Sequence, residues 1–359
     1  MRILALMKYG ARAASTRQRL LQYVPYLSRN GIEIEVAALL DDEYLARLAN
    51  DDRTGVTRIA MAYLRRLKSI WRSRTFDAIW VHCEAFPYLP AAFERIVAMT
   101  GKPIIYDYDD AIFHQYDNHK NAIIRRLLGK KLTPLLSRAS LCICGNAYIQ
   151  EYSARYCRNT MIIPTVVDTS IYEPAPTTSD HSLTIGWIGS PSTWSYVEPL
   201  LPEILPCIAT AGARLKVVGA GPRAKGLPGV EAVDWTEESE VNEVQSFDIG
   251  IMPLPDEQWA RGKCGYKLIQ YMACGLPVIA SPVGVNAEIV TDGENGYLVQ
   301  NPDGWRAALI MLLADSKLRQ KFGENGRNRV IERYSLQSQE LRLLAALTEI
   351  SKINANPSL

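Results

Sequence analysis

Short apolar segments alternate with helical segments along almost the whole chain, and this alternation limits the possible folds more than any other feature. Apolar runs of strand length occur in the first half at residues 2–7, 78–82, 103–106 and 141–144. Segments with apolar residues at helical spacing separate them, at residues 15–30, 56–74, 88–99 and 122–136. Strands and helices in alternation form βαβ units, so we predict an α/β fold built on a doubly wound parallel sheet.

A second series of the same kind begins at residue 183. The segment before it, residues 173–181, is rich in Pro, Thr, Ser and Asp, which is typical of a linker. A chain of 359 residues, 48% of them hydrophobic, is long enough for two domains. We therefore predict Rossmann-like domains at residues 1–172 and 182–335. The strands of the second series are predicted at residues 183–188, 215–218, 249–253 and 277–281, and its helices at residues 197–209, 305–314 and 336–352.

Charge is divided unevenly between the two halves. Residues 1–172 hold 24 basic and 16 acidic side chains, whereas the remainder holds 16 basic and 22 acidic ones. The basic half favours an anionic partner, such as a membrane surface or a phosphorylated lipid. Nucleic acid is disfavoured, because no recognised binding motif accompanies the charge. Basic amphipathic segments at residues 61–74 and 120–138 are either solvated helix faces or membrane contacts.

The cysteines and the N-terminal residues indicate a cytoplasmic protein. The seven cysteines stand mostly among apolar residues, as Cys142 and Cys144 do, so we expect buried free thiols rather than disulfides. Residues 1–7 are too short for a signal sequence, and no apolar run approaches the roughly 20 residues that span a membrane. We expect a protein of the cytoplasm that makes peripheral contact with the inner face of the plasma membrane.

A glycine-containing loop with three cations, Arg261, Lys263 and Lys267, leads into a helix and then a strand. A helix that begins at Gly265 directs backbone N–H groups and the positive end of its dipole outward near Tyr266. Such a helix start binds phosphate well, and the lysines add point charges to it. The other interpretation is an ordinary basic surface loop before a helix.

Residues 272–281, Met-Ala-Cys-Gly-Leu-Pro-Val-Ile-Ala-Ser, closely resemble the donor-binding segment of retaining nucleotide-sugar glycosyltransferases of family 4. The family has glutamates where this chain has Gly262 and Gln270. The resemblance implies the GT-B fold, two Rossmann-like domains facing a cleft, with a last helix at about residues 336–359 that packs back on the first domain. It also implies a UDP- or GDP-sugar donor and no cofactor. Gln270 is then expected to contact the ribose or base, and Gly262 to leave the donor hexose without its usual carboxylate.

Glycine turns in the second domain also resemble parts of this donor site. Gly189, Ser190 and Thr193 resemble the family's phosphate-binding strand and loop, and Gly219 lies in a turn that the family places beside the nucleotide. A dinucleotide-binding fingerprint is the alternative for this second turn, but Pro222 is awkward there and no helix clearly follows.

In the first domain, Gly10 and Arg17 resemble a loop that closes over the diphosphate in the family. Arg17 and Arg19 have a second interpretation as ordinary helix surface.

Polar residues follow two strands of the first domain, where open α/β sheets place ligands. Asp107, Asp109 and Asp110 could cap a helix, hold a divalent metal or position the acceptor. The resemblance favours the last, so we predict Asp109 and Asp110 as catalytic and Asp107 as acceptor-binding, with no metal. His82 is predicted to orient the acceptor hydroxyl and Glu84 to contact the acceptor, although a lone histidine is more often structural.

These features predict a retaining glycosyltransferase of surface polysaccharide or lipopolysaccharide biosynthesis. Negative charge grows on the diphosphate as the glycosidic bond breaks, and the helix start, with Lys263 and Lys267 as catalytic residues, stabilises it. The resemblance implies that the departing phosphate takes the acceptor proton. The acceptor is expected to be a glycan or a polyprenyl-linked saccharide. A non-catalytic sugar-nucleotide-binding subunit, which would explain both lost glutamates, and a sugar-nucleotide epimerase are the alternatives.

Overall fold

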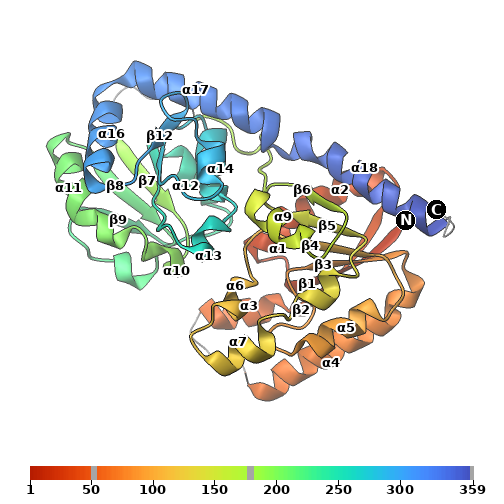
Figure 1. Cartoon of the computed structure of the whole chain (residues 1–359). Helices are drawn as coiled ribbons and strands as arrows, with labels where there is room; N and C mark the ends of the chain where they lie inside the picture. Colours follow the sequence, from red (N-terminus) through yellow and green to blue (C-terminus); the bar gives the residue numbers. More distant parts are fainter. Residues whose placement is uncertain (50–54, 176–181, 356–359) are drawn as a thin grey trace. The chain divides into compact units, whose positions relative to one another are not determined.

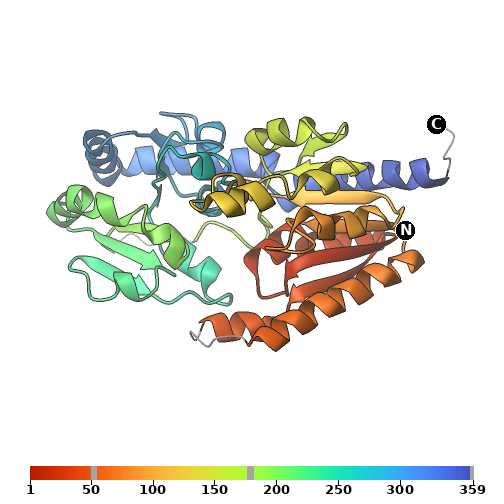
Figure 2. The same cartoon turned by 60° about the horizontal axis from the view of Figure 1, so that its bottom comes forward.

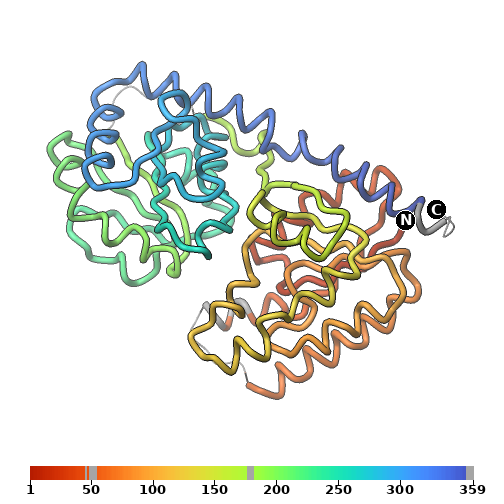
Figure 3. Tube along the Cα trace, viewed as in Figure 1, coloured from red at the N-terminus to blue at the C-terminus, as the bar shows by residue number. Residues whose placement is uncertain are grey.

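The computed structural model describes residues 1–49, 55–175 and 182–355. The chain forms two compact units. The first contains Met1–Thr165, Gly262–Cys264 and Gln339–Leu359, and the second contains Val166–Arg261 and Gly265–Ser338. The chain passes between the units before the predicted linker, of which residues 176–181 lie outside the described part. Figure 3 follows the chain through the last helix, α18 (Leu336–Ala355), which begins in the second unit and continues in the first.

The first unit is built on a six-stranded parallel sheet (Figure 1). The strand order β2-β1-β3-β4-β5-β6 places β1 and β3 side by side at the point where the order reverses. Most residues of the four central strands are buried, which explains their continuous apolar sequences. The strands are β1 (Arg2–Tyr9), β2 (Glu33–Leu40), β3 (Ala78–His82), β4 (Ile104–Tyr108), β5 (Leu141–Cys144) and β6 (Thr160–Ile162).

Two predicted helices of this unit are broken at prolines. The segment at residues 15–30 restarts where Pro25 stands in the first turn of α2, and the segment at 122–136 restarts where Pro134 opens α8. Proline has no N–H to donate, so it begins a helix more readily than it continues one. The helices are α1 (Ala14–Arg19), η1 (Leu21–Tyr23), α2 (Val24–Arg29), α3 (Asp42–Ala49), α4 (Val56–Arg72), η2 (Ser73–Thr75), α5 (Ala91–Ala98), α6 (His114–Asp117), α7 (Ala122–Leu128), α8 (Thr133–Leu136) and α9 (Ala147–Ala154).

The second unit repeats the plan with the strand order β12-β11-β10-β7-β8-β9, again all parallel. Its order reverses between β7 and β10. The strands are β7 (Thr184–Ile188), β8 (Arg214–Val218), β9 (Val230–Val233), β10 (Ile249–Met252), β11 (Val278–Ala280) and β12 (Gly296–Leu298).

Helices bury apolar residues against both faces of this second sheet, in two hydrophobic clusters. One cluster includes α14 and the other includes α11 and α16. Helix α17 was not predicted, because its 18 residues are mostly polar and only Phe322 and Val330 are buried apolar side chains in it. The helices are α10 (Pro191–Trp194), η3 (Glu198–Leu200), α11 (Leu201–Thr210), η4 (Pro222–Ala224), α12 (Glu240–Gln245), α13 (Gln258–Arg261), α14 (Tyr266–Ala273), α15 (Asn286–Ile289), α16 (Pro302–Ala314) and α17 (Ser316–Arg333).

Two basic residues that were expected on solvated helix faces are buried. Arg66 of α4 donates to the carbonyls of Met7 and Ala37, and Lys131 donates to the carbonyl of Phe86 in the loop after β3. The expectation of buried free thiols is confirmed for most cysteines, because all seven are free and five are buried. In the described part of the chain, none of the helices is both long and apolar enough to cross a bilayer.

Candidate functional site

The carboxyl ends of β7 and β8 meet the start of α14 at two glycines. A Cβ atom on Gly219 would lie 2.3 Å from the carbonyl oxygen of Gly189, and one on Gly189 would lie 2.8 Å from Cε of Lys267. The Lys267 ammonium lies over the ring of Trp187, 5.6 Å from its centroid. The strand order reverses between β7 and β10, so the carboxyl end of β7, which Gly189 follows, borders the crevice in which open α/β sheets bind ligands. Three residues predicted from separate motifs therefore lie together.

Helix α14 begins at Gly265 for two physical reasons. The residue has φ 68° and ψ 16°, a left-handed conformation that favours glycine. A Cβ atom there would also lie 2.4 Å from Cδ1 of Ile289. At the other end of the helix, Tyr271 accepts a hydrogen bond from the N–H of Ile188, which ties α14 to the end of β7. The half-buried Tyr266 packs on the hydrophobic cluster that contains the buried residues of α14.

The predicted phosphate-binding hydroxyls cap a short helix. Ser190 and Thr193 form a capping box at the start of α10. The N–H of Ser190 donates to Oγ1 of Thr193, which in turn donates to the Ser190 carbonyl. Their contact with a donor remains a prediction.

Gln270 lies in a hydrogen-bonded group inside the second unit. It is 2% exposed, and its Nε2 donates to the Tyr172 hydroxyl (3.0 Å) and to Oε1 of Glu240 (2.9 Å). Trp235 donates to the other oxygen of the same carboxylate (2.6 Å). A carboxylate thus lies beside the position where the family has its glutamate. Sequence analysis missed Glu240, because it comes from α12, far from Gln270 along the chain.

Arg261 faces an acid of its own unit. Its guanidinium makes two hydrogen bonds to Asp256, at 2.7 and 3.1 Å, and these bonds lower the pKa of that carboxyl. A hollow of about 480 Å³ opens at the ends of the neighbouring strands, with Leu254, Ser281 and Trp305 among its lining residues.

Residues Gly262–Cys264 belong to the first unit. The Lys263 ammonium lies 3.2 Å from Oδ2 of Asp110, and Asn146 donates to the carbonyls of Gly262 and Lys263. A Cβ atom on Gly262 would lie 2.2 Å from Cβ of Ala111. The space beside Ala111 therefore excludes the glutamate that the family has at this position.

Asp107 was predicted to contact the acceptor, but β4 extends to Tyr108 and carries this residue inside the sheet. The Asp107 side chain is fully buried, with Oδ1 2.5 Å from Nη2 of Arg19. Arg19 also donates to the Ile163 carbonyl and is itself buried, so it is not helix surface. Asp107 is therefore engaged by an arginine instead of forming a metal-binding pair with Asp109.

His82 and Asp109 form a buried pair at the ends of β3 and β4. Nε2 of His82 lies 3.7 Å from Oδ1 of Asp109, whose other oxygen accepts a hydrogen bond from Thr165. Burial alone raises the pKa of Asp109, but His82 and the charge of Arg19 lower it to about 2. Burial lowers the pKa of His82, but the neighbouring sulfur of Cys83 and the Asp109 carboxylate raise it well above its ordinary value. Both shifts favour the charged forms, an imidazolium beside a carboxylate.

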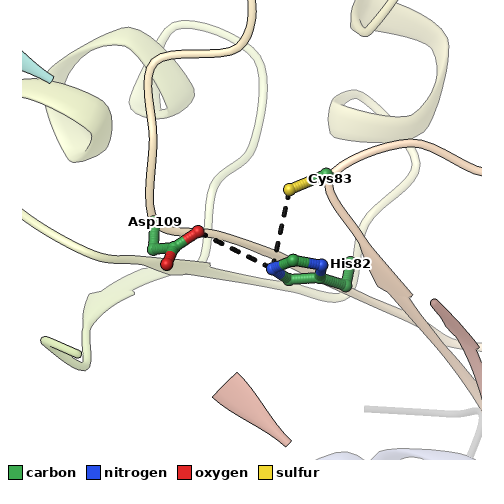
Figure 4. A group of neighbouring side chains, drawn as sticks. All are labelled: His82, Cys83 and Asp109. Atoms are coloured by element: carbon green, nitrogen blue, oxygen red, sulfur yellow. Dashed lines mark hydrogen bonds and ion pairs between the residues drawn. The ribbon is translucent and has the colours of Figure 1, made fainter. Parts of the chain in front are cut away.

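Figure 4 shows the Cys83 sulfur beside the same imidazole nitrogen as the Asp109 carboxylate. The sulfur lies 3.5 Å from this nitrogen. The three donor atoms of His82, Cys83 and Asp109 lie within 4.8 Å of one another, close enough to hold a metal ion. Nitrogen, sulfur and oxygen together are ligands that Zn²⁺ accepts. A protonated imidazole and a neutral thiol must first lose their protons, and burial raises the pKa of the Cys83 thiol.

Glu84 was also predicted to contact the acceptor, but it is 1% exposed. Its carboxylate accepts a hydrogen bond from the Tyr116 hydroxyl (2.6 Å) and lies 3.2 Å from the Lys131 ammonium. Lys131 pairs with Glu94 as well, at 2.6 Å. These contacts hold Glu84, and with it the loop after β3, in place.

The loop after β1 is held by Arg17 of α1 and by Asp42 of α3, which accepts a hydrogen bond from the N–H of Arg12. Arg17 donates to the carbonyls of Ala11 and Arg12, and a Cβ atom on Gly10 would lie 2.3 Å from Oδ1 of Asp42. The predicted contact of Gly10 and Arg17 with the diphosphate remains a prediction.

Comparison with known families decides the class of the second unit. Residues 182–315 match the family described as Glycosyl transferases group 1. Residues 182–315 are a group 1 glycosyltransferase domain. This group 1 domain contains Gly189, Gly219 and Lys267.

Curated relatives match parts of the chain. An uncharacterised glycosyltransferase of Methanocaldococcus jannaschii is 42% identical over 65 residues, which are 18% of this chain and 18% of that protein. A phosphatidyl-myo-inositol mannosyltransferase of Propionibacterium freudenreichii is 26% identical over 268 residues, 70% of this chain and 65% of that protein. The chain thus spans less than two thirds of the length of either relative.

Solved structures match nearly the whole chain. The crystal structure of Anabaena HepE in complex with UDP and glucose has a TM-score of 0.69 and 14% identity, and covers 97% of this chain and 99% of that one. The predicted GT-B fold is confirmed by this likeness and by the two six-stranded parallel sheets.

Proposed function

We propose that the protein is a retaining glycosyltransferase that transfers a sugar from a UDP- or GDP-sugar to a saccharide acceptor. The observation that carries the proposal is the meeting of Gly189, Gly219 and Lys267 at the carboxyl edge of the group 1 domain. Glycines let backbone N–H groups approach a pyrophosphate closely, and the start of α14 and an ammonium attract its charge. The acceptor is a glycan or a polyprenyl-linked saccharide of surface polysaccharide or lipopolysaccharide biosynthesis.

The nucleoside lies on the half-buried side chains of Trp235 and Glu240. The indole offers an apolar face to the base, and a Glu240 oxygen accepts hydrogen bonds from the ribose hydroxyls. Gln270 holds this carboxylate in place by its hydrogen bond of 2.9 Å. The pair thereby performs the work of the glutamate that is missing at position 270.

The reaction follows from charge and needs no metal in this proposal. The diphosphate gains negative charge as the C–O bond breaks, and Lys267 and the N–H groups of α14 stabilise it. Lys263 is the second predicted cation. The acceptor hydroxyl is oriented by the His82–Asp109 pair and gives its proton to the departing phosphate. Asp110, which is paired with Lys263, keeps its predicted role beside the acceptor.

We also propose that α4 brings the protein to an anionic membrane. Leu64, Leu67 and Trp71 lie at helical spacing, and their side chains are 64%, 36% and 68% exposed. Figure 2 shows α4 running along the outside of the first unit, where it packs on β2. A basic residue follows each apolar one: Arg65, Lys68 and Arg72. Apolar residues inserted beside basic ones are the features by which surface helices bind anionic lipid.

A donor panel tests the assignment. Melting temperatures are measured with UDP-, GDP- and dTDP-sugars, and hydrolysis is followed by release of nucleotide. A transferase is stabilised by its donor and hydrolyses it slowly without an acceptor. Stabilisation without hydrolysis, with or without saccharides, would instead identify a non-catalytic binding subunit, and no stabilisation by any nucleotide contradicts the proposal.

A further inference from the structure

Tyr88 is an outlier in both exposure and backbone conformation. Residues 82–87 are all buried, yet the side chain of Tyr88 is 67% exposed. Its φ is +60°, a left-handed conformation that is strained for a bulky side chain. Strained residues of this kind persist only where their surroundings hold them, and they gather at binding and active sites.

Buried groups hold Tyr88 in this conformation. Its N–H donates to the Tyr116 hydroxyl (3.1 Å), which itself donates to Glu84. The preceding carbonyl, of Pro87, accepts a hydrogen bond of 2.5 Å from the Tyr63 hydroxyl. The Tyr88 backbone is thus held, through the Tyr116 hydroxyl, by the Glu84 carboxylate that also pairs with Lys131.

The Tyr88 ring is fixed as well as its backbone. The Tyr116 ring meets it edge-on with centroids 6.4 Å apart, and the Lys8 ammonium lies 5.5 Å from its centroid. Lys8 is otherwise near Glu84, at 4.0 Å. A large aromatic face is therefore held in solvent on the loop that follows the candidate residue His82 at the end of β3.

We propose that Tyr88 is a stacking platform for a pyranose ring of the acceptor. One face of a pyranose presents mainly C–H groups, which pack on an aromatic face, while its rim hydroxyls need hydrogen-bond partners such as the Lys8 ammonium. A ring held in place in the free protein loses little conformational freedom on binding. This inference rests on the proposed transferase, since it supplies the acceptor side of the same site.

Saturation-transfer NMR tests the platform without any turnover. Protein aromatic protons are irradiated in the presence of methyl glycosides of glucose, galactose, mannose and N-acetylglucosamine. We expect transfer to pyranose C–H protons in the wild type and in Tyr88→Phe, and loss of most of it in Tyr88→Gly. Glycine tolerates the positive φ, so this variant removes the ring without adding strain. Tyr156→Ala, at another exposed tyrosine of the first unit, is the control and keeps the signal.

Kinetics give a second, separate readout. In Tyr88→Gly the KM for the acceptor rises about tenfold or more while donor hydrolysis is unchanged. An unchanged NMR signal in Tyr88→Gly, or no signal with any glycoside in the wild type, overturns the platform. Equal losses of acceptor transfer and donor hydrolysis in this variant also overturn it, because they indicate a structural defect. Absence of donor hydrolysis in the wild type contradicts the transferase proposal instead. The NMR result still decides whether Tyr88 binds a pyranose.

Discussion

The carboxyl edges of the two sheets are built from different chemistry. In the first unit, buried acids and bases neutralise one another: Arg19 with Asp107, His82 with Asp109, and Lys131 with Glu84 and Glu94. In the second unit, the corner at β7 and β8 consists of glycines, a helix start and a lysine over a tryptophan ring.

This difference indicates what each edge can bind. A closed network of ion pairs has little net charge to offer, but it fixes side chains precisely and suits an uncharged hydroxyl acceptor. Backbone N–H groups with a cation attract an anion and need no rearrangement as charge develops. In the proposed transferase, the first edge binds the acceptor and the second binds the diphosphate.

The largest expected effect is at Lys267. Lys267→Ala should lower kcat by roughly 10²–10³, because a cation aimed at developing charge contributes several kcal/mol in the transition state. The melting temperature should stay close to that of the wild type. Lys225→Ala removes a lysine from the exposed surface of the same unit and should leave kcat unchanged. Equal kcat values for Lys267→Ala and Lys225→Ala would contradict the assignment of diphosphate binding to the edge of the second sheet.

Asp109→Asn should lower kcat/KM for the acceptor by about 10- to 100-fold. Without the Asp109 carboxylate, one of the causes that raise the pKa of His82 is gone, so the imidazole loses its proton at a lower pH than in the wild type and the loss should grow with rising pH. A pH-independent loss would mean that the pair is only structural.

The same substitution should also change stability in a defined pH window. The lowered pKa of Asp109 contributes stability above its ordinary value of 3.8, which is lost as the pH falls toward 2. The raised pKa of His82 contributes stability below its ordinary value of 6.5, which is lost at higher pH. The melting temperatures of wild type and variant should therefore differ most between about pH 4 and 6.5. A constant difference from pH 3 to 8 contradicts the ion pair.

A smaller effect is expected on the outer surface of the first unit. The double variant Leu64→Ser, Trp71→Ser should lower binding to phosphatidylglycerol vesicles by about tenfold, with little change for phosphatidylcholine. Ile310→Ser removes a side chain that is 54% exposed in the second unit and is the matched control. Sedimentation with vesicles measures both, and equal binding by the two variants excludes α4 as the membrane contact.

The smallest expected effect is on stability, when the glycine at the start of α14 is replaced. Gly265 and Gly293 have φ of 68° and 75°, but only Gly265 is crowded, by Ile289. Alanine should cost about 1 kcal/mol from strain at either position, and a further 1–3 kcal/mol from crowding at Gly265. Gly265→Ala should therefore melt several degrees below Gly293→Ala. Equal melting temperatures would show that the start of α14 adapts freely.

The alternation of elements could be predicted from the sequence, and the buried charges could not. Strands β3, β5 and β7 were predicted almost to the residue, because they are apolar and bounded by turn residues. Arg66 and Lys131 were expected at the surface, where such residues almost always lie, and helix surface was one of two interpretations of Arg19. Their burial depends on carboxylates and carbonyls from segments far away along the chain, which no local pattern reveals.

The candidate donor site could be predicted where glycine and lysine mark it, but not where partners come from elsewhere in the chain. Gly189, Gly219 and Lys267 were found from their motifs. Glu240 was missed, because only the fold brings α12 beside Gln270. The replacement of the family glutamate by Gly262 also has a structural cause, Ala111, that the sequence does not disclose.

The most direct test of the central claim is a crystal structure of the protein with the nucleotide diphosphate that stabilises it most. The account predicts the pyrophosphate against Gly189 and Gly219, with the Lys267 ammonium and the first N–H groups of α14 within hydrogen-bond distance. A nucleotide bound away from this corner, or bound there with its phosphates turned into solvent, would contradict it.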